Sequence, residues 1–94
     1  MPALLIRHKV ADVAVWKPVF DDHSTTRAAN GSLGGRVFRN HADPEEVLVL
    51  LEWDDLERAD LFALSDDLNE AMVRSGVADR PDIWILTEID RTAH

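Results

Sequence analysis

Residues 47–53 form the most apolar stretch of the chain, reading Val-Leu-Val-Leu-Leu-Glu-Trp. The run is too short for a buried helix, and apolar residues at both alternate positions are typical of a strand covered on both faces. The rest of the chain offers two long helical segments, which would both lie on one face of a sheet. We therefore expect a second copy of the chain to cover the other face.

The first thirty residues predict a strand followed by a helix. The second half of residues 3–10 alternates, which favours a strand with one face formed by Ile6, His8 and Val10 and the other by Arg7 and Lys9. Asp12 stands where a helix N-cap is expected, and Asn30-Gly31 is a suitable helix end. Between them, spacings of three and four predict one helical stripe made of Val13, Trp16, Phe20, His23 and Arg27.

The remaining segments predict a hairpin, a broken helix and a last strand. Residues 33–40 form the second strand, and the turn at residues 41–44 is too short for a crossover, so residues 47–53 should pair with it antiparallel. Asp54 is expected to cap the next helix, with Glu57 completing a capping box. We expect a helix break at Ser65, a helix end at Gly76, a strand over residues 82–90 and a loose tail over 91–94.

The resulting order, β-α-β-β-α-β, is that of a ferredoxin-like α+β sandwich with an antiparallel sheet and helices on one side. We expect residues 1–94 to form a single domain. A whole apolar sheet face predicts a partner, and two such faces packed together would give a homodimeric α+β barrel.

Composition narrows the classes of partner. The formal net charge of -8 argues against nucleic acid and anionic membranes, and the chain has no cysteine for disulfides or thiolate chemistry. The N-terminal residues do not read as a signal peptide, and no apolar run approaches membrane-spanning length. A cytoplasmic protein is expected.

Short motifs over nearly the whole chain resemble one superfamily. They are Arg7-His8-Lys9-Val10 leading to Asp12, Trp16-Lys17-Pro18-Val19-Phe20-Asp21-Asp22-His23, Arg27, Arg36-Val37-Phe38-Arg39, Glu52-Trp53-Asp54-Asp55-Leu56-Glu57 and Pro81-Asp82-Ile83-Trp84. This set resembles the dimeric α+β-barrel superfamily, and more narrowly its small proteins labelled "cyclase" or antibiotic-biosynthesis-monooxygenase-like. The resemblance implies the fold and the dimer. It does not fix the activity, because the superfamily includes quinone-forming monooxygenases, haem-degrading enzymes, polyketide cyclases and muconolactone isomerases.

His23 and Arg27 are the candidate catalytic residues, because they continue an apolar helix stripe by one and two turns. In a pocket between helix and sheet, His23 would act as acid or base and Arg27 would hold an enolate or carboxylate. In the alternative interpretation, the last helical turns overhang the sheet edge, and both side chains meet water or a carboxylate such as Asp22.

Aromatic residues and a second histidine are candidate substrate-binding groups. The set is Trp16, Phe20, His8, Trp53 and Phe62. Each has a plainer role: His8 could be satisfied within a packed interface, and the aromatic residues could be ordinary core or dimer packing. Arg36 and Arg39 should project on opposite faces of their strand, and His41 should be exposed in a turn.

No metal site is predicted, because the histidines show no chelating spacing and adjacent residues of Asp21-Asp22-His23 diverge on a helix. A haem site stays open, with His23 as its candidate proximal ligand. Our first hypothesis is an enzyme without a cofactor, performing monooxygenation or cyclisation on a small, largely apolar aromatic or polyketide-like substrate. The second is a non-catalytic ligand-binding or accessory protein. The third is a structural dimer with a filled core.

Overall fold

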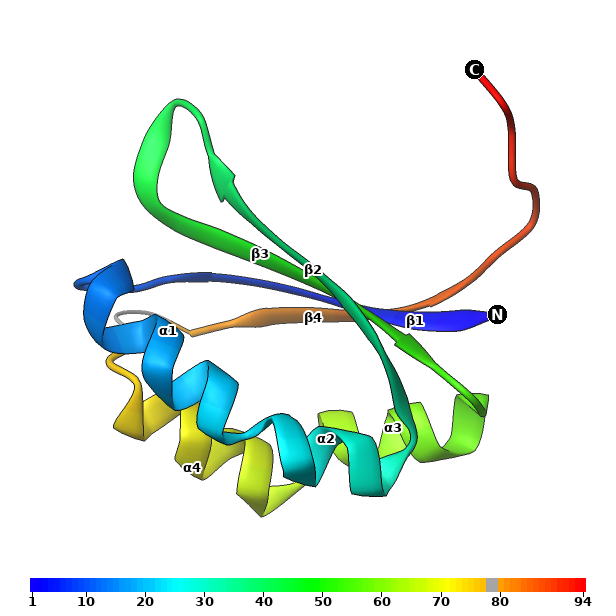
Figure 1. The fold of residues 1–94 in the computed structure, drawn as a ribbon, viewed down its shortest axis with the longest axis horizontal. Helices are drawn as coiled ribbons and strands as arrows, with labels where there is room; N and C mark the ends of the chain where they lie inside the picture. Colours follow the sequence, from blue (N-terminus) through cyan, green and yellow to red (C-terminus); the bar gives the residue numbers. More distant parts are fainter. Residues whose placement is uncertain (78–79) are drawn as a thin grey trace.

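The structure is a computed structural model that describes residues 1–77 and 80–94 (Figure 1). The strands are β1 (Pro2–Lys9), β2 (Ser32–Asn40), β3 (Asp43–Trp53) and β4 (Asp82–Thr87), and the helices are α1 (Val13–Asp22), α2 (Ser24–Asn30), α3 (Leu56–Ala63) and α4 (Asp66–Arg74). The strands form one sheet in the order β2-β3-β1-β4, and each neighbouring pair is antiparallel. This confirms the ferredoxin-like α+β fold.

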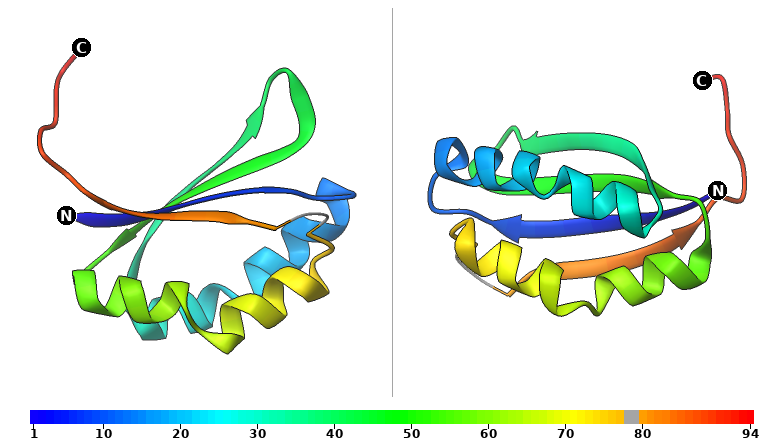
Figure 2. Two further views of the ribbon diagram at one scale, coloured as in Figure 1. Left: turned by 180° about the vertical axis from the view of Figure 1, so that it is seen from behind. Right: turned by 60° about the horizontal axis from the view of Figure 1, so that its bottom comes forward.

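All the helices lie on one face of the sheet. Helices α1 and α2 run beneath the half that contains β2 and β3, and α3 and α4 run beneath the half that contains β4 (Figure 2). The chain beyond β4 leaves the body on the other side (Figure 1). Any space between the helices and the sheet is therefore bordered by α1 and α2 on one side and by α3 and α4 on the other.

The pairing register confirms the predicted strand faces. Ile6 pairs with both Val49 and Ile83, which places apolar side chains of three strands on the helix-facing side. This side carries the buried core, which also includes Leu4, Val47, Leu51, Trp53, Trp16, Ala59, Phe62 and Leu68. Alternate residues of a strand face the same side, so His8 lies in the same buried layer as Ile6 and Val10.

The opposite side of the sheet also carries apolar side chains. We call this set the outer apolar face: Leu5, Phe38, Leu48, Leu50, Trp84 and Leu86. In the single chain, Phe38 and Trp84 are each 45% exposed. No helix of the described residues covers this face, as the sequence predicts (Figure 2).

Two helix details differ from the sequence prediction. The helix expected over residues 13–30 is interrupted at His23, which ends α1 and precedes α2. Low-propensity Ser24, Thr25 and Thr26 follow it, although the Arg27 amide still donates to the His23 carbonyl at 3.1 Å. Asp55, not Asp54, caps α3 by accepting from the Arg58 amide, so Glu57 does not complete a capping box.

Two strand boundaries also differ. Strand β3 begins at Asp43, so only residues 41–42 form the turn. Strand β4 ends at Thr87, because β1 supplies no pairing partner beyond Pro2. Ile89 lies past the strand and is 97% exposed, so the prediction of a strand that continues to residue 90 is wrong.

Candidate functional site

An apolar cavity lies between the helices and the sheet. Its free volume is about 40 Å³. The sheet contributes Ile6, His8, Val49 and Leu51; the helical side contributes Trp16, Val19, Phe20, His23, Arg27, Phe62, Leu68, Ala71, Met72 and Ser75. The presence of this cavity beside Trp16, Phe20 and His23 contradicts the hypothesis of a completely filled core.

His23 reaches the cavity from the junction between α1 and α2. Its side chain is 9% exposed, and its ring lies 5.9 Å from the ring of Phe62. Burial lowers the pKa of His23 below its ordinary value, and the positive charge of Arg27 lowers it further. Asp67 opposes this shift. The imidazole is therefore neutral near pH 7 and able to accept a proton.

Arg27 enters the same cavity one turn later and is also 9% exposed. Its Nη1 donates to the carbonyl of Phe20 at 2.7 Å, and its guanidinium carbon lies 3.8 Å above the Phe20 ring. Among the described residues no carboxylate forms an ion pair with it, and burial lowers the pKa of its guanidinium. The group still stays protonated at neutral pH, so the cavity edge holds a cation suited to an anionic ligand.

Of the aromatic residues predicted to bind substrate, Trp16, Phe20 and Phe62 line the cavity, and His8 lines it as well. Trp16 and Phe20 stack with ring centroids 4.9 Å apart, and His8 meets Trp16 edge-on at 5.6 Å. Phe62 closes the cavity from α3. Placing Trp53 in this wall is wrong: it packs behind Phe62 at 4.9 Å and does not line the cavity.

The alternative interpretation of the helix stripe does not fit the structure. His23 and Arg27 do not overhang the sheet edge, since both are buried. Arg27 bonds to the Phe20 carbonyl instead of to Asp22. The two side chains therefore form one polar edge on an otherwise apolar cavity.

The wall formed by α4 was missed as part of a site. Leu68, Ala71, Met72 and Ser75 lie on the apolar stripe that the sequence indicates for this helix, but the stripe reads as ordinary core. The Ser75 hydroxyl donates to the Met72 carbonyl at 3.0 Å, so its hydrogen is engaged within the helix. Periodicity could identify these residues as buried but not as cavity-lining.

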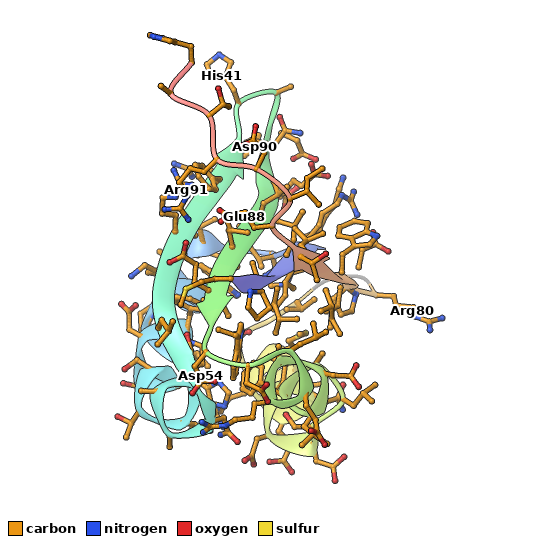
Figure 3. All side chains as sticks on the ribbon, turned by 90° about the vertical axis from the view of Figure 1, so that its right-hand side faces the viewer. His41, Asp54, Arg80, Glu88, Asp90 and Arg91 are labelled. Carbon is orange, nitrogen blue, oxygen red and sulfur yellow. The ribbon has the colours of Figure 1, made fainter. Side chains whose placement is uncertain are left out.

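The remaining candidates lie elsewhere. Arg36 pairs with Leu50 and Arg39 with Val47, so they project on opposite faces as predicted. His41 is exposed at the tip of the β2–β3 hairpin, far from the helices (Figure 3). The described residues contain no cluster of three metal-ligating side chains. None of the described helices has the length and apolar character needed to cross a membrane.

Solved structures share this backbone arrangement over nearly the whole chain. SnoaB, a cofactor-independent oxygenase from Streptomyces nogalater, matches with a TM-score of 0.79 at 11% identity, over 99% of this chain and 97% of that chain. A Bordetella bronchiseptica protein provisionally named an antibiotic biosynthesis monooxygenase matches with a TM-score of 0.78 at 15% identity, over 94% and 96%. A similarly named Caulobacter crescentus protein matches with a TM-score of 0.73 at 21% identity, over 95% and 90%.

Comparisons of sequence alone give no match to a protein-family model or to a curated protein. The identities to the solved structures are low, so the likeness establishes a shared fold. The activity has to be argued from the site.

Proposed function

We propose that this chain, which has the fold of the antibiotic-biosynthesis-monooxygenase-like proteins, binds a small, largely apolar molecule between its sheet and helices. It acts there without a cofactor, as a monooxygenase or cyclase on an aromatic or polyketide-like substrate. The observation that carries the proposal is a neutral, buried His23 beside a buried Arg27 that forms no ion pair with a described residue, at one edge of an apolar cavity. The likeness to SnoaB, itself named a cofactor-independent oxygenase, supports the same class.

The two residues have complementary roles in this proposal. Neutral His23 takes a proton from a carbon or hydroxyl group conjugated to a carbonyl, and Arg27 stabilises the resulting enolate oxygen. The apolar walls exclude water, which strengthens the charge interaction between guanidinium and oxyanion. The enolate can then attack a carbonyl within the same molecule, in a cyclase. In a monooxygenase it can add dissolved oxygen to give a hydroperoxide, which loses water and leaves a new carbonyl on that carbon.

One observation favours a second candidate, a non-catalytic ligand-binding protein. The His23 imidazole makes no hydrogen bond to a described residue. Catalytic bases are usually oriented by a third group, so its absence here suits a residue that only contacts a ligand. Fold and cavity are the same in both candidates.

Two substitutions separate these candidates. Wild-type protein and variants are incubated in air with hydroxynaphthoates, while oxygen uptake and products are followed and binding is measured by calorimetry. His23→Ala is expected to lower turnover about 100-fold or more and to retain binding, since it removes the proton acceptor. Arg27→Ala is expected to lower turnover and to weaken ligand binding, because it removes the cation that would bind the anionic group of the ligand.

His41→Ala is the matched control, since His41 lies at the exposed hairpin tip and should leave turnover unchanged. Wild-type turnover in His23→Ala would overturn the catalytic role. Ligand binding without turnover in the wild type would favour the binding protein.

We also propose that the chain forms a homodimer through the outer apolar face. Oligomerisation is a common source of buried area for a chain of 94 residues. Around this face, Arg7 bonds to Glu46 at 2.6 Å and to Asp82 at 3.0 Å, and Lys9 bonds to Asp43 at 2.9 Å. These charges are already paired within one chain, so a second copy could pack over Arg7 and Lys9 without leaving either charge unpaired.

A further inference from the structure

A second hollow adjoins the cavity, and we call it the groove. It lies between the α1–α2 segment and β2, and its volume is about 270 Å³. Phe20, Arg27 and Leu51 line both the groove and the cavity, so these three side chains separate the two spaces. Figure 1 shows β2 rising directly from the end of α2.

The two volumes admit different molecules. An apolar protein cavity of about 150 Å³ holds one benzene molecule, and a single water occupies about 30 Å³ of liquid. The inner cavity, at about 40 Å³, is therefore too small for an aromatic ring. The groove, at about 270 Å³, is large enough for one.

Missing side chains help to make this space. Gly35 pairs with Leu51, so this position of β2 faces the helices. Because glycine has no side chain, the space between this position and Arg27 stays free. A Cβ atom at Gly35 would collide with the Leu50 carbonyl oxygen, which ties this position to glycine. Gly34 has a φ of +111° and open space around its missing Cβ.

The charged lining of the groove has one sign. Arg27 forms its inner end, and no Asp or Glu is among the described lining residues. The side chain of Arg36 does not add to this charge, because Arg36 pairs with Leu50 and projects onto the outer face of the edge strand. Arg27 uses one N–H group on the Phe20 carbonyl, and a guanidinium carries five. In a chain of net charge -8, a guanidinium with no carboxylate among the described lining residues favours an anionic ligand.

We infer that the groove binds an aromatic carboxylate, with the ring between α2 and β2 and the carboxylate on Arg27. The inference rests on the proposed function, since it assigns the substrate class and the entry side of the same site. The inner cavity then receives only a small group next to His23. Arg27 is the specificity-determining residue, because it contacts the ligand from the wall shared by both spaces.

The test uses 2-naphthoate and its neutral isostere 2-naphthamide as probes on the full chain. Binding is measured by calorimetry and mapped by changes in backbone amide NMR signals. We expect the acid to bind about tenfold or more tightly than the amide, as for a charge-assisted pair. The affected amides should be those of the groove, such as Ser24, Ala28, Gly34 and Gly35.

Variants test the two parts of the inference separately. Arg27→Gln should remove the preference for the acid. Val37→Trp should abolish binding, because Val37 lines the groove and not the inner cavity. Arg39→Gln is the control: this arginine lies on β2 outside the groove and should leave binding unchanged.

Several results would overturn the inference. These are equal affinity for acid and amide, no binding of the acid at millimolar concentration, or signal changes confined to inner residues such as Ala71 and Ser75. The mapping on wild-type protein decides the matter even if Val37→Trp does not fold. Failure here leaves the role of His23 standing, because that role is measured by turnover in His23→Ala.

Discussion

Leu5→Glu is expected to convert the proposed homodimer into monomers at micromolar concentration. Leu5 lies at the centre of the outer apolar face, paired with Leu50 on one side and Trp84 on the other. In a monomer the new carboxylate would reach water, since Leu5 is only half-buried. In a two-fold dimer each interface would contain two such charges, and burying an unpaired charge costs several kcal/mol. We expect the dissociation constant to rise about 1000-fold or more.

Light scattering coupled to size exclusion measures this result. The wild type should show twice the chain mass of 10.6 kDa, and Leu5→Glu should show 10.6 kDa. Val73→Glu is the control, because Val73 is 75% exposed on α4, on the helical side. A monomeric wild type, or an unchanged dimer of Leu5→Glu, would contradict the proposed interface.

Trp53→Ala is expected to lower the free energy of unfolding by about 3–5 kcal/mol, the usual cost of removing a fully buried large aromatic side chain. Trp53 is 0% exposed, and its ring packs against Phe62 at 4.9 Å. Phe62 in turn closes the cavity. The void left by alanine would remove support from the cavity wall as well as apolar burial.

Trp53→Phe distinguishes ring packing from the indole N–H. The Trp53 Nε1 atom is buried with no hydrogen-bond partner among the described residues, so phenylalanine removes an unsatisfied donor while keeping a ring. Trp53→Phe should therefore lower the free energy of unfolding clearly less than Trp53→Ala does. Leu64→Ala, at a position 79% exposed, should stay within about 0.5 kcal/mol of wild type.

Urea unfolding followed by far-ultraviolet circular dichroism gives these values. All variants are compared at one protein concentration, because the stability of a dimer depends on it. A loss below about 1 kcal/mol in Trp53→Ala would show that this residue is not a central packing element.

The sequence allowed the sheet faces and the His23–Arg27 pair to be predicted, because both follow from strict periodicities. Alternation in β1 places Ile6 and His8 on one face whatever the sheet order. Helical spacing keeps Arg27 on the stripe of Phe20 even though the helix is interrupted at His23. The intact hydrogen bond between the Arg27 amide and the His23 carbonyl explains why the interruption did not shift the stripe.

Trp53 and the groove could not be predicted, since both depend on distances between elements. Whether a tryptophan at the end of β3 lines the cavity or packs behind it depends on where α3 places Phe62. The groove depends on the separation of α2 and β2 and on the register shift between Ser32 and Gly34. Gly34-Gly35 near the start of β2 is typical of an irregular strand, but the pair does not predict the space beside it.

The protonation of His23, followed by NMR titration of its ring signals, tests the central claim most directly. His23 and Arg27 share one edge of the apolar cavity, so the pKa of His23 should lie below its ordinary value of 6.5. Arg27→Gln should raise that pKa by removing a nearby positive charge, and Asp67→Asn should lower it. A His23 pKa at or above 6.5 that does not respond to Arg27→Gln would contradict the account.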